Sequence, residues 1–132
     1  RLSLYNRLDN CKNEDELKVL HNELQDRFGS IPPQVEDLFW TVRSRKLAIT
    51  LGFERLILKD EILKCYFISK PDSPFFESAI FQNILQYIQT ALRNVQLKQT
   101  GKYCTLTVND TKDMRQLYQF LQGMCSEILV KK

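Results

Sequence analysis

Two groups of residues near the start of the chain have types that could take part in acid–base catalysis. His21 is the only histidine, and no serine or cysteine accompanies it at a spacing typical of a nucleophile and its base. The acidic run Glu14-Asp15-Glu16 falls at the expected start of a helix, where the helix dipole stabilises negative charge. Both groups therefore have a structural explanation, and we expect no catalytic residue among them.

The pair Gly101-Lys102 could belong to a phosphate-binding loop. Such a loop needs a glycine five positions before the Gly-Lys pair and a serine or threonine after it. Here Tyr103 follows, and the pair lies between two strand-like runs. We expect a hairpin turn, and no other catalytic motif of the common hydrolase, metalloprotease, dinucleotide or calcium-loop types is present.

The four cysteines are far apart and form no CxxC pair, although a zinc site usually draws on close pairs of ligands. They are Cys11, Cys65, Cys104 and Cys125. We expect free thiols, buried or half-buried, in a reducing cytosol.

The composition indicates one globular domain without a membrane span. The chain has 132 residues, of which 43% are hydrophobic and 27% charged, and its net charge is +3. It starts with helix-patterned residues and no Met, so we expect a piece of a longer protein. The tightest basic cluster, Arg43, Arg45 and Lys46, is interpreted as a solvated helix face, with phosphate contact as the alternative.

The best-defined element runs from Asn13 to Pro33. Asn13 is an N-cap residue, and Glu16 follows it at capping-box spacing. Gly29 and the two prolines that follow end the helix. Apolar residues recur every three or four positions and predict one stripe, formed by Leu17, Leu20, Leu24 and Phe28.

A third helix is expected from Pro33 to just before Gly52. Its periodic face consists of Val35, Leu38, Phe39, Val42, Lys46 and Ile49. Trp40 lies beside that face. We expect it to pack on a neighbouring element, and exposure for a partner is the alternative.

The remaining pattern predicts a short first helix and, after Gly52, two hairpins that are each followed by a helix. The fold class is therefore α+β: an N-terminal three-helix module (1–52), then β-β-α-β-β-α (53–132) with a mainly antiparallel four-stranded sheet and helices on one face. The expected spans are a helix over 1–11, strands over 53–58 and 62–68, a loop over 69–77, a helix over 78–92, strands over 95–99 and 103–109, and a last helix capped at Asp110-Thr111 that frays from Leu129 to Lys132.

A set of residues in the N-terminal third matches a known pattern. These are Arg1, Leu2, Tyr5, Arg7-Leu8, Glu16-Leu17, Glu23-Leu24, Asp26-Arg27-Phe28-Gly29, Pro32 and the run from Val35 to Leu38. The pattern resembles the start of the C-terminal domain of bacterial transcription-repair coupling factors, the TRCF family. The match is dense to about Leu51, and beyond that point it rests on element order and length.

The resemblance implies that residues 1–132 form a single C-terminal regulatory domain, without catalytic activity, of a cytoplasmic ATP-dependent DNA translocase. Such a protein removes stalled RNA polymerase from DNA and recruits nucleotide-excision repair through UvrA. The resemblance further implies that this domain docks on the N-terminal UvrB-like module of the same chain and masks its UvrA-binding surface. ATP and Mg²⁺ are then expected elsewhere in the longer protein, with no cofactor and no membrane partner for this segment.

Reversible docking on a protein favours exposed cations, and arginine pairs bidentately with carboxylates. The docking residues predicted on this basis are Arg27, Arg43, Arg45 and Lys46. Arg27 has a structural alternative, contact with a helix-end carbonyl or with Phe28. The alternative function is a small nucleic-acid-binding α+β domain. The small positive charge and the element order favour it, whereas the lack of a basic patch and of paired aromatics on a strand opposes it.

Overall fold

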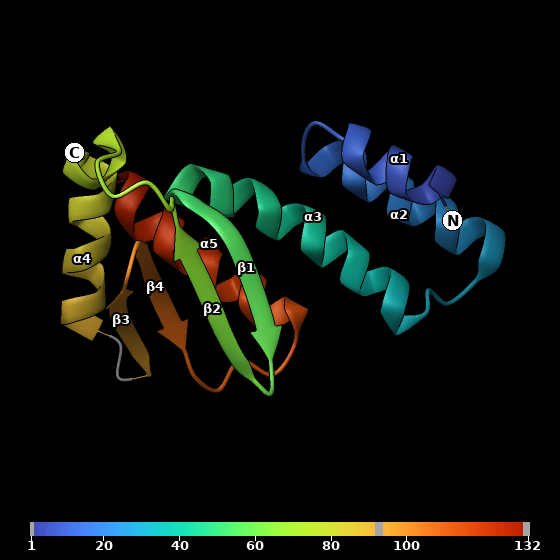
Figure 1. Ribbon diagram of the computed structural model, residues 1–132. Coiled ribbons are helices and arrows are strands. Elements are labelled where there is room, and N and C mark those ends of the chain that lie inside the picture. Colours follow the sequence, from blue (N-terminus) through green and yellow to red (C-terminus); the bar gives the residue numbers. More distant parts are fainter. Residues whose placement is uncertain (1, 92–93, 131–132) are drawn as a thin grey trace. The chain divides into compact units, whose positions relative to one another are not determined.

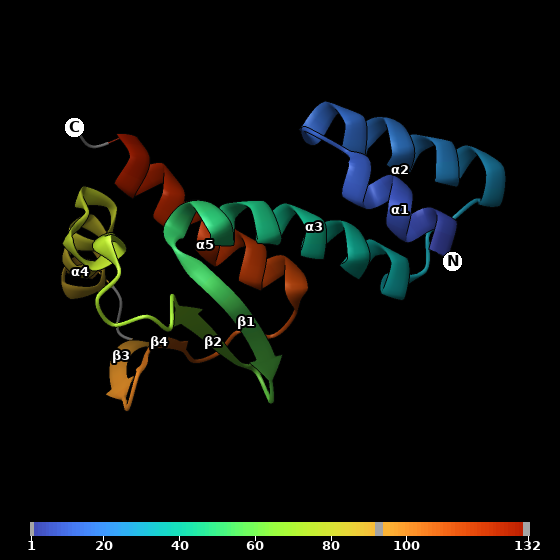
Figure 2. The ribbon, with the colours of Figure 1, turned by 45° about the horizontal axis from the view of Figure 1, so that its top comes forward.

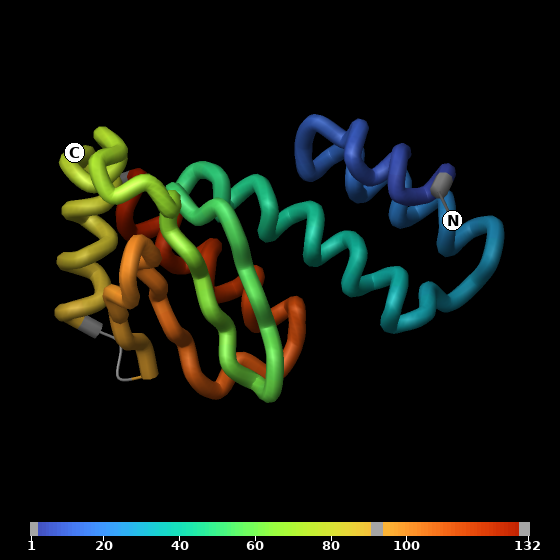
Figure 3. Tube along the Cα trace, viewed as in Figure 1, coloured from blue at the N-terminus to red at the C-terminus, as the bar shows by residue number. Residues whose placement is uncertain are grey.

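The computed structural model describes residues 2–91 and 94–130, and Figure 1 shows its helices and strands. Three helices are followed by β-β-α-β-β-α, as predicted. The Cα trace in Figure 3 follows the same order along the chain. The described residues group into two compact units, one ending at Arg43 and one beginning at Ser44. The expected helix start at Arg1, the helix end at Leu92 and the last part of the expected frayed end, Lys131-Lys132, lie outside the described residues. Leu129 and Val130, which the sequence also predicts to fray, belong to the last helix.

The first unit consists of α1 (Leu2–Asn10), α2 (Glu14–Phe28) and the first part of α3 (Pro33–Leu51). Apolar side chains from all three helices form its core. The buried members are Leu8, Leu17, Leu20, Phe39 and Val42, and the half-buried Leu4, Cys11, Leu24, Val35 and Leu38 pack around them.

Both ends of α2 are formed as the sequence predicts. The side chain of Asn13 accepts a hydrogen bond from the Glu16 amide at 2.9 Å. The Glu16 carboxylate in turn accepts from the Lys12 amide at 2.9 Å, one residue before the position of a standard capping box. Gly29 ends the helix with a φ of 79°, a conformation that favours glycine, and its amide donates to the Gln25 carbonyl.

The predicted stripe of α2 is wrong at its last position. Phe28 is 71% exposed, whereas Leu17 and Leu20 are buried. Phe28 is not part of the core of the first unit, to which α2 contributes Leu17, Leu20 and the half-buried Leu24. The last turn of α2 therefore carries an aromatic ring in solvent.

The predicted periodic face of α3 is also wrong in its second half. Lys46 is exposed and Ile49 is 69% exposed, while Ala48 and Leu51 are buried. Val42 belongs to the core of the first unit, and Ala48 and Leu51 belong to that of the second. One helix that contributes to two cores buries different faces along its length, so no single stripe describes it.

The second unit contains a four-stranded antiparallel sheet with strand order β1-β2-β4-β3. The strands are β1 (Phe53–Lys59), β2 (Ile62–Phe67), β3 (Val95–Thr100) and β4 (Tyr103–Val108). Asp60 and Glu61 form the β1–β2 turn with φ of 54° and 62°. Positive φ at both central residues is characteristic of the type I′ turn of two-residue hairpins.

Helices α4 (Ala79–Ala91) and α5 (Met114–Val130) lie on one face of this sheet (Figure 2). The core between them is fully apolar at its centre. It is formed by Leu63, Cys65, Phe67, Leu106 and Val108 from the sheet and by Ile84, Leu117, Leu121, Met124 and Ile128 from the helices. The predicted fold class is confirmed.

Two local predictions in this unit need correction. The N-cap of α5 is Asp113, whose carboxylate accepts from the Gln116 amide at 2.9 Å. Thr111 does not cap the helix, because α5 begins only at Met114 and the Thr111 hydroxyl donates to the Val108 carbonyl at 3.4 Å. Its amide donates to the Glu61 carbonyl of the β1–β2 turn. The expected loop at 69–77 contains a 3₁₀ helix, Pro74–Glu77, because Ser73 caps it and the rings of Phe75 and Phe76 pack on the core.

The cysteines are free thiols, as predicted, and they should differ in reactivity. Burial raises the pKa of the Cys65, Cys104 and Cys125 thiols, so little of the reactive thiolate forms. Cys11 is only half-buried. We expect Ellman's reagent to label one thiol quickly in the folded chain and the other three only after unfolding. A Cys11→Ser variant should lose the fast phase, and two fast thiols in the native chain would contradict this assignment.

Candidate functional site

The α2–α3 face of the first unit holds Arg43 in a fixed position. Its Nε donates to Oε1 of Glu14 at 2.9 Å, and its Nη2 donates to Oε2 at 2.8 Å. The guanidinium also lies over the Trp40 ring, with its Cζ 4.7 Å from the ring centroid. The side chain of Arg43 is only 15% exposed. A bidentate pair and a cation–π contact together pre-organise this arginine.

An open groove runs along this face. Its lining consists of Lys18, His21, Asn22, Glu36, Trp40 and Arg43. His21 Nε2 and Glu36 Oε1 are 2.7 Å apart, and the His21 ring packs edge-on against Phe39. The lining includes no serine, threonine or cysteine, so the pair lacks a nucleophile. The groove lies between α2 and α3 and is lined mainly by polar and charged side chains.

The predicted docking residues do not form one cluster. Arg27 lies in the last turn of α2, with its Cζ 5.5 Å from the Phe28 ring centroid. Glu14, the partner of Arg43, begins α2, which places Arg27 about 20 Å further along that helix. Arg45 and Lys46 follow on α3 and are exposed.

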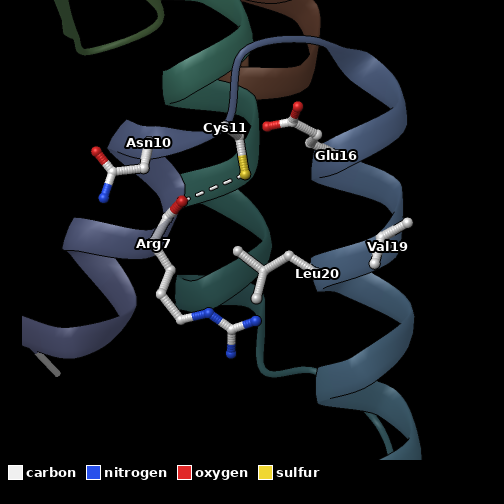
Figure 4. Close-up of a pocket in the computed structure, with 6 residues that line it drawn as sticks. All are labelled: Arg7, Asn10, Cys11, Glu16, Val19 and Leu20. Atoms are coloured by element: carbon white, nitrogen blue, oxygen red, sulfur yellow. Dashed lines mark hydrogen bonds between the residues drawn. The ribbon is translucent and has the colours of Figure 1, made fainter.

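A second pocket of this unit lies between α1 and α2, and Figure 4 shows its lining. The Cys11 thiol donates to the Arg7 carbonyl at 3.3 Å, and the Arg7 guanidinium forms a bidentate pair with Glu23. The hydrogen bond from Arg7 holds the pKa of the Glu23 carboxyl below its usual range. The Cys11 thiol, the Arg7 guanidinium and the Glu23 carboxylate all form hydrogen bonds within the unit. The pocket is therefore explained by the packing of α1 against α2.

The second unit has a feature that the search for sequence motifs missed. Tyr66 of β2 and Tyr103 of β4 lie on one face of the sheet with their ring centroids 6.1 Å apart. They are far apart in the sequence, so no spacing within one strand reveals the pair. The signal available was the alternation in β2, which places Lys64 and Tyr66 opposite the buried Leu63, Cys65 and Phe67.

Loss of the bidentate pair between Arg43 and Glu14 should destabilise the first unit. We expect Arg43→Lys to lower the free energy of unfolding by about 1 kcal/mol, because lysine keeps the charge but loses the bidentate pair and the planar stacking. Urea unfolding followed by Trp40 fluorescence measures it. In a double-mutant cycle with Glu14→Gln, the coupling energy should be about 0.5–1 kcal/mol. A coupling indistinguishable from zero would contradict a stabilising pair.

Within residues 2–91 and 94–130, no group of three or more His, Cys, Asp and Glu side chains could hold a metal ion. None of the helices in this part of the chain has the length and apolarity needed to cross a membrane.

Comparison with known proteins places the chain in one family. A family model described as the TRCF domain matches residues 1–78. The transcription-repair-coupling factor of Rickettsia bellii (strain RML369-C) is 28% identical over 102 residues, which cover 77% of this chain and 8% of that protein. The factor of Escherichia coli (strain K12) is 41% identical over 56 residues, 42% of this chain and 5% of that protein. The chain thus spans less than a tenth of the curated relatives it matches.

The fold has a counterpart among solved structures. The crystal structure of the C-terminal domain of transcription-repair coupling factor superposes with a TM-score of 0.74 at 17% identity. The superposition covers 99% of this chain and 82% of that one. At this identity the likeness concerns the fold.

Proposed function

The chain belongs to the TRCF domain family, and on that basis we propose that it is the non-catalytic C-terminal regulatory domain of a transcription-repair coupling factor. The observation that carries the proposal is the agreement between the family match and the fold of the solved C-terminal domain. The longer protein is then an ATP-dependent DNA translocase of the bacterial cytoplasm that removes stalled RNA polymerase. ATP and Mg²⁺ bind in its other domains.

The proposed action of this domain is autoinhibition by docking. It binds the N-terminal UvrB-like module of the same chain and masks the surface that recruits UvrA. The docking free energy must be modest so that the cycle of the motor can release the domain. An intermolecular dissociation constant of about 1–100 µM, or about −5 to −8 kcal/mol, satisfies that condition.

The proposed contacts on the docking surface of this domain are its basic side chains. Arg27 carries an exposed guanidinium beside the exposed Phe28 ring, and arginine and aromatic residues are enriched in the energetic centres of interfaces. Arg43 is already paired with Glu14, so we assign it an orienting role in the groove. Arg45 and Lys46 add positive charge further along α3.

Deletion of this domain from the longer protein tests the function. We expect deletion to raise both the affinity for UvrA and the ATPase rate. Without the domain, the UvrA-binding surface is no longer masked and the motor is no longer inhibited by docking. Both quantities can be measured on the purified full-length and truncated proteins. Unchanged UvrA affinity together with an unchanged ATPase rate would exclude autoinhibition.

A point variant tests the docking surface without removing the domain. Arg27→Glu in the full-length protein should raise UvrA binding toward the level of the deletion, because a repulsive charge replaces an attractive one. Arg115→Glu is the matched control, because it reverses the charge of an exposed residue in the second unit. It should behave as wild type. Equal effects of the two reversals would show that only total charge matters.

A further inference from the structure

The sheet of the second unit carries its helices on one face, and its opposite face is lined by cations, tyrosines and threonines. A shallow groove of about 410 Å³ crosses this face. All four strands contribute to it, through Arg55, Lys64, Tyr66, Lys98, Thr100, Tyr103, Thr105 and Thr107. We call this surface the open sheet face. Its composition is unlike that of an ordinary solvated sheet, which mixes both signs of charge.

Cross-strand pairing arranges these side chains in rows. Arg55 pairs with Tyr66, Tyr66 with Thr105, and Thr105 with Lys98. With neighbouring strands about 4.8 Å apart, this row is about 14 Å long and has a cation at each end and a tyrosine between them. Tyr103 pairs with Thr100 in a second row next to it.

The charge of the groove is of one sign. Arg55, Lys64 and Lys98 line it with no carboxylate among the lining residues, and in the described part of the chain none of the three forms an ion pair. A neighbouring depression at the β1–β2 turn adds Lys59 and one carboxylate, Asp60. Three unneutralised cations so close together attract a polyanion.

The open sheet face carries two aromatic rings, Tyr66 and Tyr103, besides its cations. The Tyr66 and Tyr103 rings are 6.1 Å apart and nearly perpendicular, and Tyr103 is 42% exposed. Cations flank both rings, with Arg55 Cζ 5.5 Å from the Tyr66 centroid and Lys102 Nζ 5.4 Å from the Tyr103 centroid. Exposed contacts of this kind are weak, so an incoming base can displace the cation toward a phosphate.

We propose that the open sheet face binds single-stranded nucleic acid, with bases stacked on Tyr66 and Tyr103 and phosphates held by Arg55, Lys64 and Lys98. Aromatic side chains on the central strands of a sheet, flanked by cations, meet the two requirements of single-strand binding. A duplex hides its base faces, and an acidic protein would use the cations but leave the rings without stacking partners. The site is independent of the docking function and lies entirely within the second unit.

Fluorescence anisotropy with the whole 132-residue chain tests the proposal. We expect a labelled 20-nucleotide oligo(dT) or oligo(U) to bind with a dissociation constant of about 10–100 µM near physiological salt. The logarithm of the association constant should fall with log[salt] at a slope of about −2, since three phosphate contacts each contribute about −0.7 on a single strand. A duplex of equal length should bind at least about fivefold more weakly.

Matched variants separate stacking from charge. Tyr66→Leu and Tyr103→Leu should each weaken binding about fivefold or more, while Tyr66→Phe keeps the ring and retains affinity. Lys98→Gln should reduce the salt slope by about 0.7, and Lys70→Gln, a loop lysine outside the groove, should leave it unchanged. Circular dichroism of each variant verifies that the fold is kept.

Three outcomes would overturn the proposal. The first is no binding at 200 µM chain and low salt. The second is equal affinity for single strand and duplex with no effect of the tyrosine variants, which indicates nonspecific charge attraction. The third is binding of poly-glutamate as tightly as oligo(dT), which identifies an acidic protein as the occupant. None of these outcomes bears on autoinhibition, which the domain deletion tests separately.

Discussion

Gly52→Ala is expected to lower the free energy of unfolding of the second unit by about 2–5 kcal/mol. Gly52 has a φ of 86°, and a Cβ built there would lie 2.2 Å from Cζ of Phe75. The backbone strain contributes about 1–2 kcal/mol. Displacing the Phe75 ring from the aromatic cluster that includes Phe67 and Phe81 adds the penalty of an overpacked core, about 1–3 kcal/mol. Urea unfolding followed by far-UV circular dichroism measures the loss.

Gly29→Ala is the matched control for this prediction. Gly29 also has positive φ, at 79°, but a Cβ there would meet nothing within 4 Å. It should therefore show only the backbone strain. In a Phe75→Leu background the Gly52→Ala penalty should fall toward the Gly29 value, since the clash is reduced. Equal penalties for the two glycines in the wild-type background would contradict the packing argument.

Phe39→Ala should lower the free energy of unfolding of the first unit by about 3–5 kcal/mol. Phe39 is 0% exposed and is the largest buried side chain in the described core of the first unit. Little can fill the cavity left behind, because the other buried members of that core in the described residues are Leu8, Leu17, Leu20 and Val42. It also supports His21 through an edge-on ring contact at 5.1 Å between centroids. Trp40 is the only tryptophan and lies in this unit, so its fluorescence during urea unfolding gives the measurement.

Phe28→Ala removes the same side chain from the same unit at a site that is 71% exposed. Its expected effect on stability is below about 0.5 kcal/mol. If Phe39→Ala and Phe28→Ala lower the free energy of unfolding by the same amount, the core assigned to the first unit is wrong. The Phe28 variant has a second use, because it should weaken docking while leaving the fold intact.

Much of the fold could be predicted because local signals agree with the tertiary structure. Asn13 and Gly29 mark the ends of α2 through hydrogen bonds and backbone angles that involve near neighbours only. The change from a period near 3.6 to a period of 2 after Gly52 likewise marks the start of the sheet.

The errors share one physical cause, which is dependence on distant parts of the chain. Ile49 is exposed because α3 contributes to two cores and buries different faces along its length. Thr111 looks like a cap in sequence, but it bonds to the β1–β2 turn fifty residues earlier. Periodicity within one segment cannot report such partners.

The candidate sites follow the same rule. Arg43 could be singled out as a basic residue on a helix, but its carboxylate partner, Glu14, belongs to another helix. The open sheet face is assembled from four strands. Alternation within β2 places Tyr66 on that face, but only the strand register shows that Tyr103 lies beside it. Residues that act together across strands become visible only when the register is known.

The most direct test of the central claim is a binding titration between this chain and the UvrB-like module of its own protein. Trp40 fluorescence or calorimetry should give a 1:1 complex with a dissociation constant of about 1–100 µM. UvrA should compete for the module, and Arg27→Glu should weaken the complex while Arg115→Glu does not. Absence of binding at several hundred micromolar, or a ternary complex in which UvrA and this chain occupy the module together, would contradict docking as the function of the domain.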